Sequence, residues 1–299
     1  MNVRIASAQY PITAHQSFEG WKKHIEKWVN TAVSQKADLL LFPEYGSMEL
    51  VSLFSLDIQQ DLHQQIIELQ SIYSDFCIFF TEISKKHNVI IVAPSFPVAV
   101  GKHMYNRTNV FGKQGLAGFQ DKFFMTRFEN EIWNIHSAPK HLTLFETSWG
   151  NFGIQTCYDI EFAMGSKLLC EAGAHVILAP SCTETLRGAT RVHIGARARS
   201  LENQCYTVVS QTVGNALWSP AVDVNFGFSG FYTTPDLDFP EEGIILTGKP
   251  QEERWIVSNL DMDKISQVRE NGQVLNFRDQ QTLKYQFNSE EINIQRIVL

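Results

Sequence analysis

The stretch at residues 37–46 reads Ala-Asp-Leu-Leu-Leu-Phe-Pro-Glu-Tyr-Gly, and it is the segment that most strongly predicts the fold. Its run of large apolar residues is typical of a strand that is buried on both faces of a sheet, as in α/β proteins. The run delivers Glu44 directly into a turn that contains Gly46. Because α/β proteins keep their functional groups where strands end at a crevice, Glu44 is a candidate site residue.

Two other predicted strands also end at side chains that can do chemistry. Lys122 follows two extended runs that meet at Gly-Lys-Gln-Gly (residues 112–115), and this pattern predicts a hairpin. Cys157 ends the run at 152–157 and precedes a helix-like stretch at 162–172, and a helix N-terminus favours a thiolate. A carboxylate base, a fixed cation and a thiol nucleophile are together the parts of an acyl-transfer site.

Each of these residues also has an ordinary interpretation. A lysine at a strand end is usually solvated, and an isolated cysteine is usually a buried structural residue. Arg199 and Glu202, on a predicted helix, could be an exposed ion pair three residues apart. Taken one by one, these residues do not establish a function.

Strand-like and helix-like segments alternate along the whole chain, without a low-complexity run or a repeat. The predicted strands lie at residues 3–10, 38–43, 89–95, 104–111, 152–157, 175–180, 206–212 and 226–234. The clearest predicted helices run over residues 17–35 and 58–86, and His87 and Asn88 stop the second one. This order favours a single α/β domain, and the hairpin makes its sheet mixed rather than wholly parallel.

Composition narrows the classes of protein that fit. The 299 residues are 44% hydrophobic and carry a net charge of −7, and no basic stripe is present that would follow a phosphate backbone, so nucleic acid is not expected as a partner. The N-terminus has no signal-peptide pattern and no segment has membrane-spanning length, which predicts a cytoplasmic protein without membrane contact. The five cysteines suggest neither a disulfide framework nor a zinc knuckle, and the histidines lack metal-ligand spacing. We therefore expect no metal and no organic cofactor.

The order and wording of the motifs resemble the nitrilase, or carbon-nitrogen hydrolase, superfamily over residues 3–270. The resemblance rests on Ala-x-x-Gln at 6–9, Phe-Pro-Glu at 42–44, Tyr-Asn at 105–106, the lysine after the hairpin, Cys-Tyr-Asp at 157–159, Ala-Pro-Ser at 179–181, Ala-Arg-Ala-x-x-x-Glu-Asn at 196–203 and Leu-Asp at 260–261. The Phe-Pro that often follows Cys-Tyr-Asp in the family is replaced here by Glu-Phe-Ala-Met-Gly (161–165). This departure affects the expected substrate more than the expected chemistry.

The resemblance implies a four-layer αββα sandwich with mixed sheets and a catalytic triad of Glu44, Lys122 and Cys157. It also implies a second glutamate, which matches Glu129, with Glu131 as the alternative. Residues expected at the oxyanion or substrate are Tyr158, Glu131, Trp133, Tyr45 and Ser181. Residues 1–270 would form the hydrolase domain, residues 271–299 an extension at an oligomer interface, and the protein a homodimer or a larger homo-oligomer.

The implied reaction is the hydrolysis of a non-peptide carbon–nitrogen bond in a small amide, through a thioester on the cysteine, with release of ammonia and a carboxylic acid. A nitrilase or an N-carbamoyl amino acid hydrolase with the same triad is the alternative within the family. Two alternatives come from other classes of protein. One is a papain-like enzyme in which Cys157 pairs with His193, and the other is a catalytically silent binding protein on the same fold.

Overall fold

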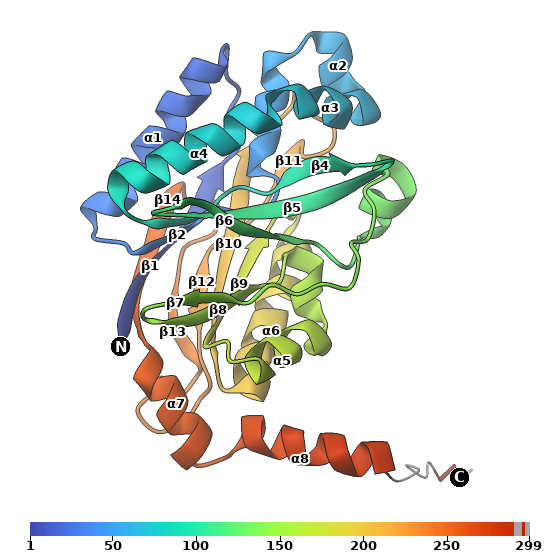
Figure 1. The fold of residues 1–299 in the computed structure, drawn as a ribbon. Coiled ribbons are helices and arrows are strands. Elements are labelled where there is room, and N and C mark those ends of the chain that lie inside the picture. The colour runs from blue at the N-terminus through green and yellow to red at the C-terminus, as the bar shows by residue number, and fades with distance from the viewer. Residues whose placement is uncertain (290–294, 297–299) are drawn as a thin grey trace.

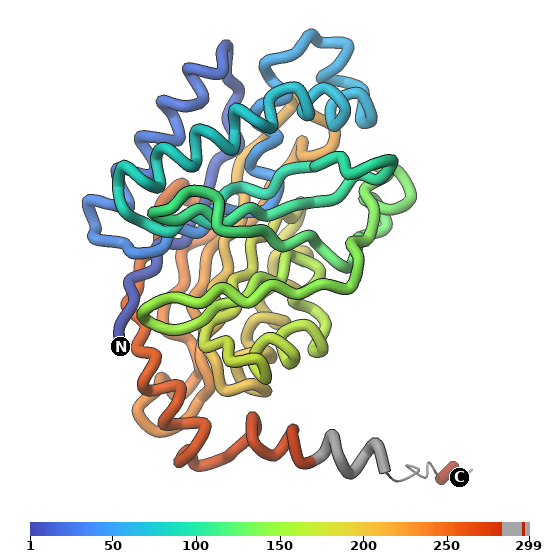
Figure 2. Tube along the Cα trace, viewed as in Figure 1, coloured from blue at the N-terminus to red at the C-terminus, as the bar shows by residue number. Residues whose placement is uncertain are grey.

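The computed structural model describes residues 1–289 and 295–296 (Figures 1 and 2). Its strands are β1 (Asn2–Pro11), β2 (Leu39–Leu41), β3 (Ile90–Val92), β4 (Phe96–Val100), β5 (His103–Gly112), β6 (Gly115–Asp121), β7 (Phe145–Thr147), β8 (Gly150–Ile154), β9 (Val176–Ser181), β10 (Tyr206–Asn215), β11 (Val224–Asn225), β12 (Gly230–Tyr232), β13 (Ile244–Thr247) and β14 (Arg254–Asp261). Its α-helices are α1 (Phe18–Ser34), α2 (Leu56–Gln60), α3 (Leu62–Glu68), α4 (Tyr73–His87), α5 (Ala163–Glu171), α6 (Leu186–Asn203), α7 (Met262–Asn271) and α8 (Asn276–Ser289). Short 3-10 or π turns are η1 (Gly46–Leu53), η2 (Leu69–Ile72), η3 (Phe128–Trp133) and η4 (Cys157–Glu161).

Strand β1 joins two halves of the sheet. It pairs in parallel with β2 and antiparallel with β14, and near its end residues 9–11 pair in parallel with residues 211–213 of β10. Strands β2 to β6 extend the first half, whereas β7, β8, β9 and β12 extend the second half from β10. The sheet is mixed, as the sequence predicts, because the β5–β6 hairpin and β14 run against their neighbours.

Alternate side chains of the same strands enter different hydrophobic layers. In β2, Leu39 and Leu41 belong to a core that also contains Val176 and Leu178 of the other half, so the two halves pack face to face. Leu40 points the opposite way, into the layer under α1 and α4, where the aromatic side chains of both helices gather. In β9, Ile177 points into the layer under α5 and α6.

The order of layers is therefore helix, sheet, sheet, helix, and the predicted αββα sandwich is confirmed. Strands buried on both faces explain why the sequence at 37–43 is almost continuously apolar rather than alternating. The functional loops then lie where the strands of both halves end.

Three predictions of local structure are wrong. Of the strand expected over residues 226–234, only Gly230–Tyr232 forms one. The single helix expected over residues 58–86 is divided into α2, α3, η2 and α4. The first break occurs at Asp61, whose carboxylate accepts the backbone N–H groups of His63 and Gln64 and so caps α3. The strand expected over 152–157 ends at Ile154, and Cys157 begins η4 instead.

Helix α7 ends at Asn271, one residue after the predicted domain boundary. The chain then forms α8, which extends along the edge of the sandwich in Figure 1. Helix α8 is tied to the body at its start, because the Phe277 N–H donates to Gln204 Oε1 at 3.1 Å. The predicted extension at 271–299 includes residues 290–294 and 297–299, which lie outside the described residues, and its place at an oligomer interface stays a prediction. None of the helices in the described ranges combines the length and the hydropathy that a membrane span requires.

Candidate active site

The ammonium group of Lys122 lies between two carboxylates, and all three side chains are buried. Lys122 follows β6, Glu44 follows β2, and Glu129 lies on η3. The Nζ atom donates to Glu44 Oε1 at 2.8 Å and to Glu129 Oε1 and Oε2 at 2.8 and 2.7 Å. Burial disfavours the charge of Lys122, but the two carboxylates outweigh burial and hold the pKa of its ammonium well above the ordinary value. Lys122 is therefore charged throughout the physiological range.

Glu44 is held by three donors from three different segments. Besides Lys122, the Asn106 side chain donates Nδ2–H to Oε1 at 2.8 Å, and the Cys182 backbone N–H donates to Oε2 at 2.9 Å. Burial raises the pKa of Glu44, the Lys122 charge lowers it, and the net shift is upward. The carboxylate is thus oriented by its donors and is a stronger base than an exposed glutamate.

Of the two candidate second glutamates, the structure brings Glu129 to Lys122 and leaves Glu131 outside. Glu129 also accepts the Tyr45 hydroxyl at 2.7 Å and both the backbone N–H and the hydroxyl of Thr126 at 2.9 Å. Burial alone would raise the pKa of Glu129, but Lys122 and these donors lower it overall. Glu131 is half exposed and pairs with Arg127 on the surface.

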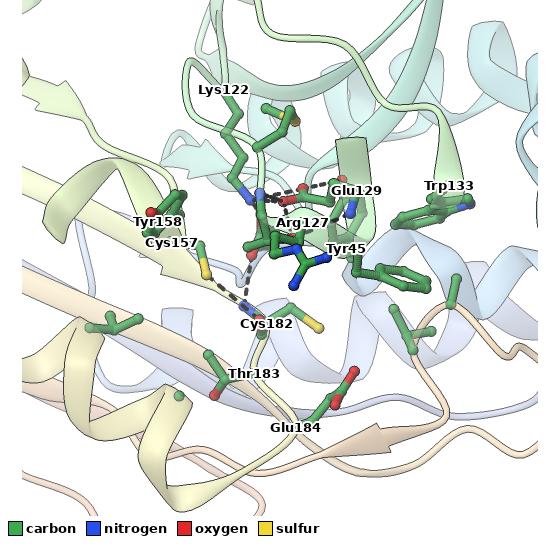
Figure 3. Close-up of a pocket in the computed structure, with 18 of the residues that line it drawn as sticks. Tyr45, Lys122, Arg127, Glu129, Trp133, Cys157, Tyr158, Cys182, Thr183 and Glu184 are labelled. Atoms are coloured by element: carbon green, nitrogen blue, oxygen red, sulfur yellow. Dashed lines mark hydrogen bonds and ion pairs between the residues drawn. The ribbon is translucent and has the colours of Figure 1, made fainter. Parts of the chain in front are cut away.

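Cys157 is the first residue of η4 and has a left-handed backbone, with φ of +49°. Its thiol donates toward the Cys182 carbonyl oxygen, with an S···O distance of 3.6 Å (Figure 3). Burial and the negative charge of Glu44 raise the pKa of Cys157 well above the ordinary thiol value, although Lys122 opposes them. At neutral pH the thiol therefore keeps its proton, and a nearby base must remove it before sulfur can attack.

These groups line a cavity of about 560 Å³. The predicted residues Tyr45, Trp133 and Tyr158 line this cavity together with Glu44, Lys122, Glu129 and Cys157. Figure 3 shows Cys157 and Lys122 on one side and Trp133 on the other. The cavity is also lined by Glu184 and by the ion pair of Glu161 with Arg191. Within the described part of the chain, no cluster of three or more His, Cys, Asp or Glu side chains is arranged to hold a metal ion.

Ser181 does not reach the cavity, which corrects the expectation that it contacts substrate. Its side chain is fully buried in β9 and its hydroxyl donates to the Ala179 carbonyl oxygen at 3.1 Å. The next residue, Cys182, lines the cavity instead and contacts both Glu44 and Cys157 through its backbone. Sequence analysis overlooked Cys182 because the groups that matter are its main-chain N–H and C=O, which residue type does not reveal.

Helix α6 supports the turn that carries Cys157. Arg199 is buried rather than exposed, because its guanidinium holds Glu202 at 2.8 and 3.0 Å and donates to the Ile160 carbonyl oxygen at 3.2 Å. His193, the partner required by the papain-like alternative, is bonded to the Tyr232 hydroxyl at 2.6 Å and stacks on Phe228. It does not line the cavity, and the alternative has no geometric support.

Comparison with known proteins agrees with this geometry. The model of the carbon-nitrogen hydrolase family matches residues 4–270. The chain belongs to the carbon-nitrogen hydrolase family. A probable hydrolase of Bacillus subtilis is 32% identical over 93% of this chain and 53% of its own length. The chloroplastic omega-amidase of Arabidopsis thaliana is 27% identical over 82% of this chain and 64% of its own length. The matched part of this carbon-nitrogen hydrolase chain thus spans between half and two thirds of these relatives.

Solved structures share the fold at low sequence identity. The carbon-nitrogen hydrolase of Helicobacter pylori has a TM-score of 0.78 at 16% identity, and the alignment covers 97% of this chain and 99% of the Helicobacter chain. A nitrilase-superfamily protein of Saccharomyces cerevisiae has a TM-score of 0.71 at 21% identity, covering 90% of this chain and 93% of its own. These structures show that the chain has the nitrilase-like αββα fold.

The burial of Lys122 between Glu44 and Glu129 predicts how the loss of its ammonium changes the stability of the fold. Lys122→Met keeps most of the side-chain volume but leaves Glu44 and Glu129 buried without a counter-charge, so the free energy of unfolding should fall by about 3–5 kcal/mol at about pH 8. Without the ammonium, the folded-state pKa of this carboxylate pair lies above its unfolded value. The loss should therefore shrink as the pH falls through the folded-state pKa, toward about pH 5.5.

Urea unfolding of both proteins at the two pH values measures this difference. Lys249→Met is the matched control, because Lys249 is 84% exposed and its removal should change stability by less than about 0.5 kcal/mol. An equal loss for Lys122→Met at both pH values would contradict the assigned charge state.

Proposed function

We propose that this chain is an amidase that hydrolyses the carbon–nitrogen bond of a small-molecule amide through a thioester on Cys157. The observation that carries the proposal is the Lys122 ammonium bonded to both Glu44 and Glu129, in the same cavity as a buried thiol. This arrangement supplies a base, a nucleophile and a fixed positive charge within one cavity.

In the first step, Glu44 accepts the thiol proton while the Cys157 sulfur bonds to the amide carbonyl carbon. The carbonyl oxygen becomes an oxyanion, which the Lys122 ammonium and the Tyr158 backbone N–H would stabilise. Removal of one such preorganised donor typically costs about 3–4 kcal/mol of transition-state stabilisation. Glu129 holds the ammonium in place, since two of the three hydrogen bonds that Nζ donates go to its carboxylate.

In the second step, the tetrahedral intermediate collapses to a thioester. Glu44 returns its proton to the departing nitrogen, and ammonia leaves as the carbon–nitrogen bond breaks. A water molecule then gives its proton to Glu44 and its oxygen to the acyl carbon. The carbon–sulfur bond breaks, the thiol regains the proton from Glu44, and a carboxylic acid is released, so one water is consumed for each amide.

An amide is favoured over the other substrates of this chemistry because relatives carry the name omega-amidase, including proteins of Arabidopsis thaliana and Saccharomyces cerevisiae. A nitrile or an N-carbamoyl amino acid requires the same base and thiol. These substrates are outcomes that the following experiment distinguishes.

Purified protein should release ammonia from one group within a panel of short aliphatic, ω-carboxy and aromatic amides, matching nitriles and N-carbamoyl amino acids. Cys157→Ala should abolish the release, because the variant has no sulfur to form the thioester. Cys77→Ala, which removes a half-buried thiol outside the cavity, should retain it. Product analysis assigns the class, since only the carbamoyl substrate also yields carbon dioxide. Ammonia release that persists in Cys157→Ala would overturn the mechanism.

We also propose that the chain forms a homodimer through α5 and α6. Apolar side chains are exposed on these two neighbouring helices, with Met164 and Leu168 on α5 and Ile194 and Leu201 on α6. Each pair has the spacing that places both members on one helix face. Exposed apolar surface of this kind is typical of an interface.

Sedimentation at micromolar concentration should accordingly give about twice the 34.1 kDa mass of one chain. Ile194→Glu should shift the mass toward one chain, because it places a charge in the apolar contact. Ile78→Glu should leave the mass unchanged, since Ile78 is also exposed but lies on α4, in the opposite helical layer. A single-chain mass for the unmodified protein would contradict the proposal.

A further inference from the structure

The segment between Lys122 and η3 is an irregular loop that forms one wall of the cavity. Residues 122–126 belong to neither a helix nor a strand, and Met125, Thr126 and Arg127 line the cavity. A loop without its own hydrogen-bond ladder holds its shape only where other groups satisfy its backbone. Two buried carboxylates do so here.

Glu129 holds the far end of this loop through the N–H and hydroxyl of Thr126, as described above. Asp159 holds the near end, directly after the lysine. The Phe124 N–H donates to Asp159 Oδ1 at 2.7 Å, and the Phe123 N–H donates to Oδ1 and Oδ2 at 3.2 and 3.1 Å. Glu129 reaches the reacting cavity, whereas Asp159 does not line it.

Asp159 lies on η4, two residues after Cys157, and that turn is itself fixed. The Asp159 N–H donates to the Thr156 carbonyl oxygen at 2.9 Å, which closes the turn around Cys157. On the other side, Arg199 of α6 donates to the Ile160 carbonyl oxygen. Gly195 allows α6 to come this close, because a Cβ atom there would lie 2.8 Å from the Ile160 oxygen.

We propose that Asp159 is a positioning residue that ties the backbone after Lys122 to the turn that carries Cys157, and so sets the ammonium in register with the thiol. The inference rests on the proposed amidase function. It assigns to Asp159 no contact with substrate and no proton transfer. Its effect passes through two backbone N–H groups, and a displacement of about 1 Å in such a constellation can cost about 10²-fold in rate.

Fold stability alone does not account for a carboxylate at this place. Burial raises the pKa of Asp159 to about 7, although the N–H groups and the Lys122 ammonium lower it. The folded-state pKa therefore lies above the ordinary value, and above neutral pH the ionised carboxylate costs the folded state free energy. The contacts of its oxygens with the lysine loop account for a buried carboxylate at this place, because they fix the geometry of the site.

Asp159→Asn tests the proposal because it keeps the shape and one acceptor oxygen but removes the charge and the second acceptor. Asp159→Leu removes both acceptors. Asp121→Asn is the matched control, since Asp121 directly precedes Lys122 and is also buried, but its carboxylate binds Arg107 at 2.7 and 2.8 Å. For each variant we would measure kcat and KM on the amide that the panel identifies, the rate of Cys157 alkylation by iodoacetamide, and the unfolding temperature.

The expected result for Asp159→Asn is a fall in kcat of about 10- to 100-fold with KM changed less than about twofold. Its unfolding temperature above neutral pH should be unchanged or raised, and Asp159→Leu should lose more kcat. Asp121→Asn should lose unfolding temperature while keeping kcat. If Asp159→Leu does not fold, the kcat of Asp159→Asn still tests the proposal.

A wild-type kcat in Asp159→Asn would overturn the proposal. The proposal would also be overturned if the kcat of Asp121→Asn fell in proportion to its unfolding temperature. Failure of the amidase function is a separate outcome, because it appears as absence of turnover in the unmodified protein. In that case, slower alkylation of Cys157 in Asp159→Asn but not in Asp121→Asn still supports the tie, and equal alkylation rates overturn it.

Discussion

The burial of one ammonium group between two carboxylates is the constraint on which the site depends. Lys122, Glu44 and Glu129 are almost fully removed from solvent, and together they carry one excess negative charge. Charges in such a place are costly unless each oxygen and each proton has a partner. The partners come from Asn106, Cys182, Tyr45 and Thr126, which lie on four separate segments.

This requirement explains why the site needs the whole sandwich. Glu44 and Asn106 come from the half of the sheet under α1 and α4, whereas Cys157 and Cys182 come from the half under α5 and α6. The Cys182 N–H on Glu44 joins one half to the other at the point where the chemistry would occur. The raised pKa values of Glu44 and Cys157 share burial as their largest cause. The charge of Glu129 adds to it at Glu44, and the charge of Glu44 adds to it at Cys157.

Sequence patterns predicted the parts of this arrangement that depend on period and residue type. The apolar run before Glu44 and the hairpin before Lys122 follow from residue type and turn residues, whereas the layer order was implied by the resemblance to the family. The choice between Glu129 and Glu131 could not be made from spacing, because a π turn places only the former at Lys122. The break at Asp61 and the contacts of Asp159 and Cys182 depend on backbone N–H groups, which every residue except proline has. The buried state of Arg199 was likewise invisible, since it depends on the Ile160 carbonyl oxygen of a distant turn.

The central claim is that Glu44, with its raised pKa, takes the proton of a thiol that would otherwise stay protonated. The pH dependence of Cys157 alkylation by iodoacetamide, followed by mass spectrometry in the unmodified protein and in Glu44→Gln, tests it most directly. The account predicts that the unmodified protein reacts at a constant rate across neutral pH and slows only when acid protonates Glu44, above the pH at which an ordinary glutamate titrates. In Glu44→Gln the constant region should disappear, leaving a rate that rises only with ionisation of the thiol at high pH. Identical profiles for the two proteins would contradict the account.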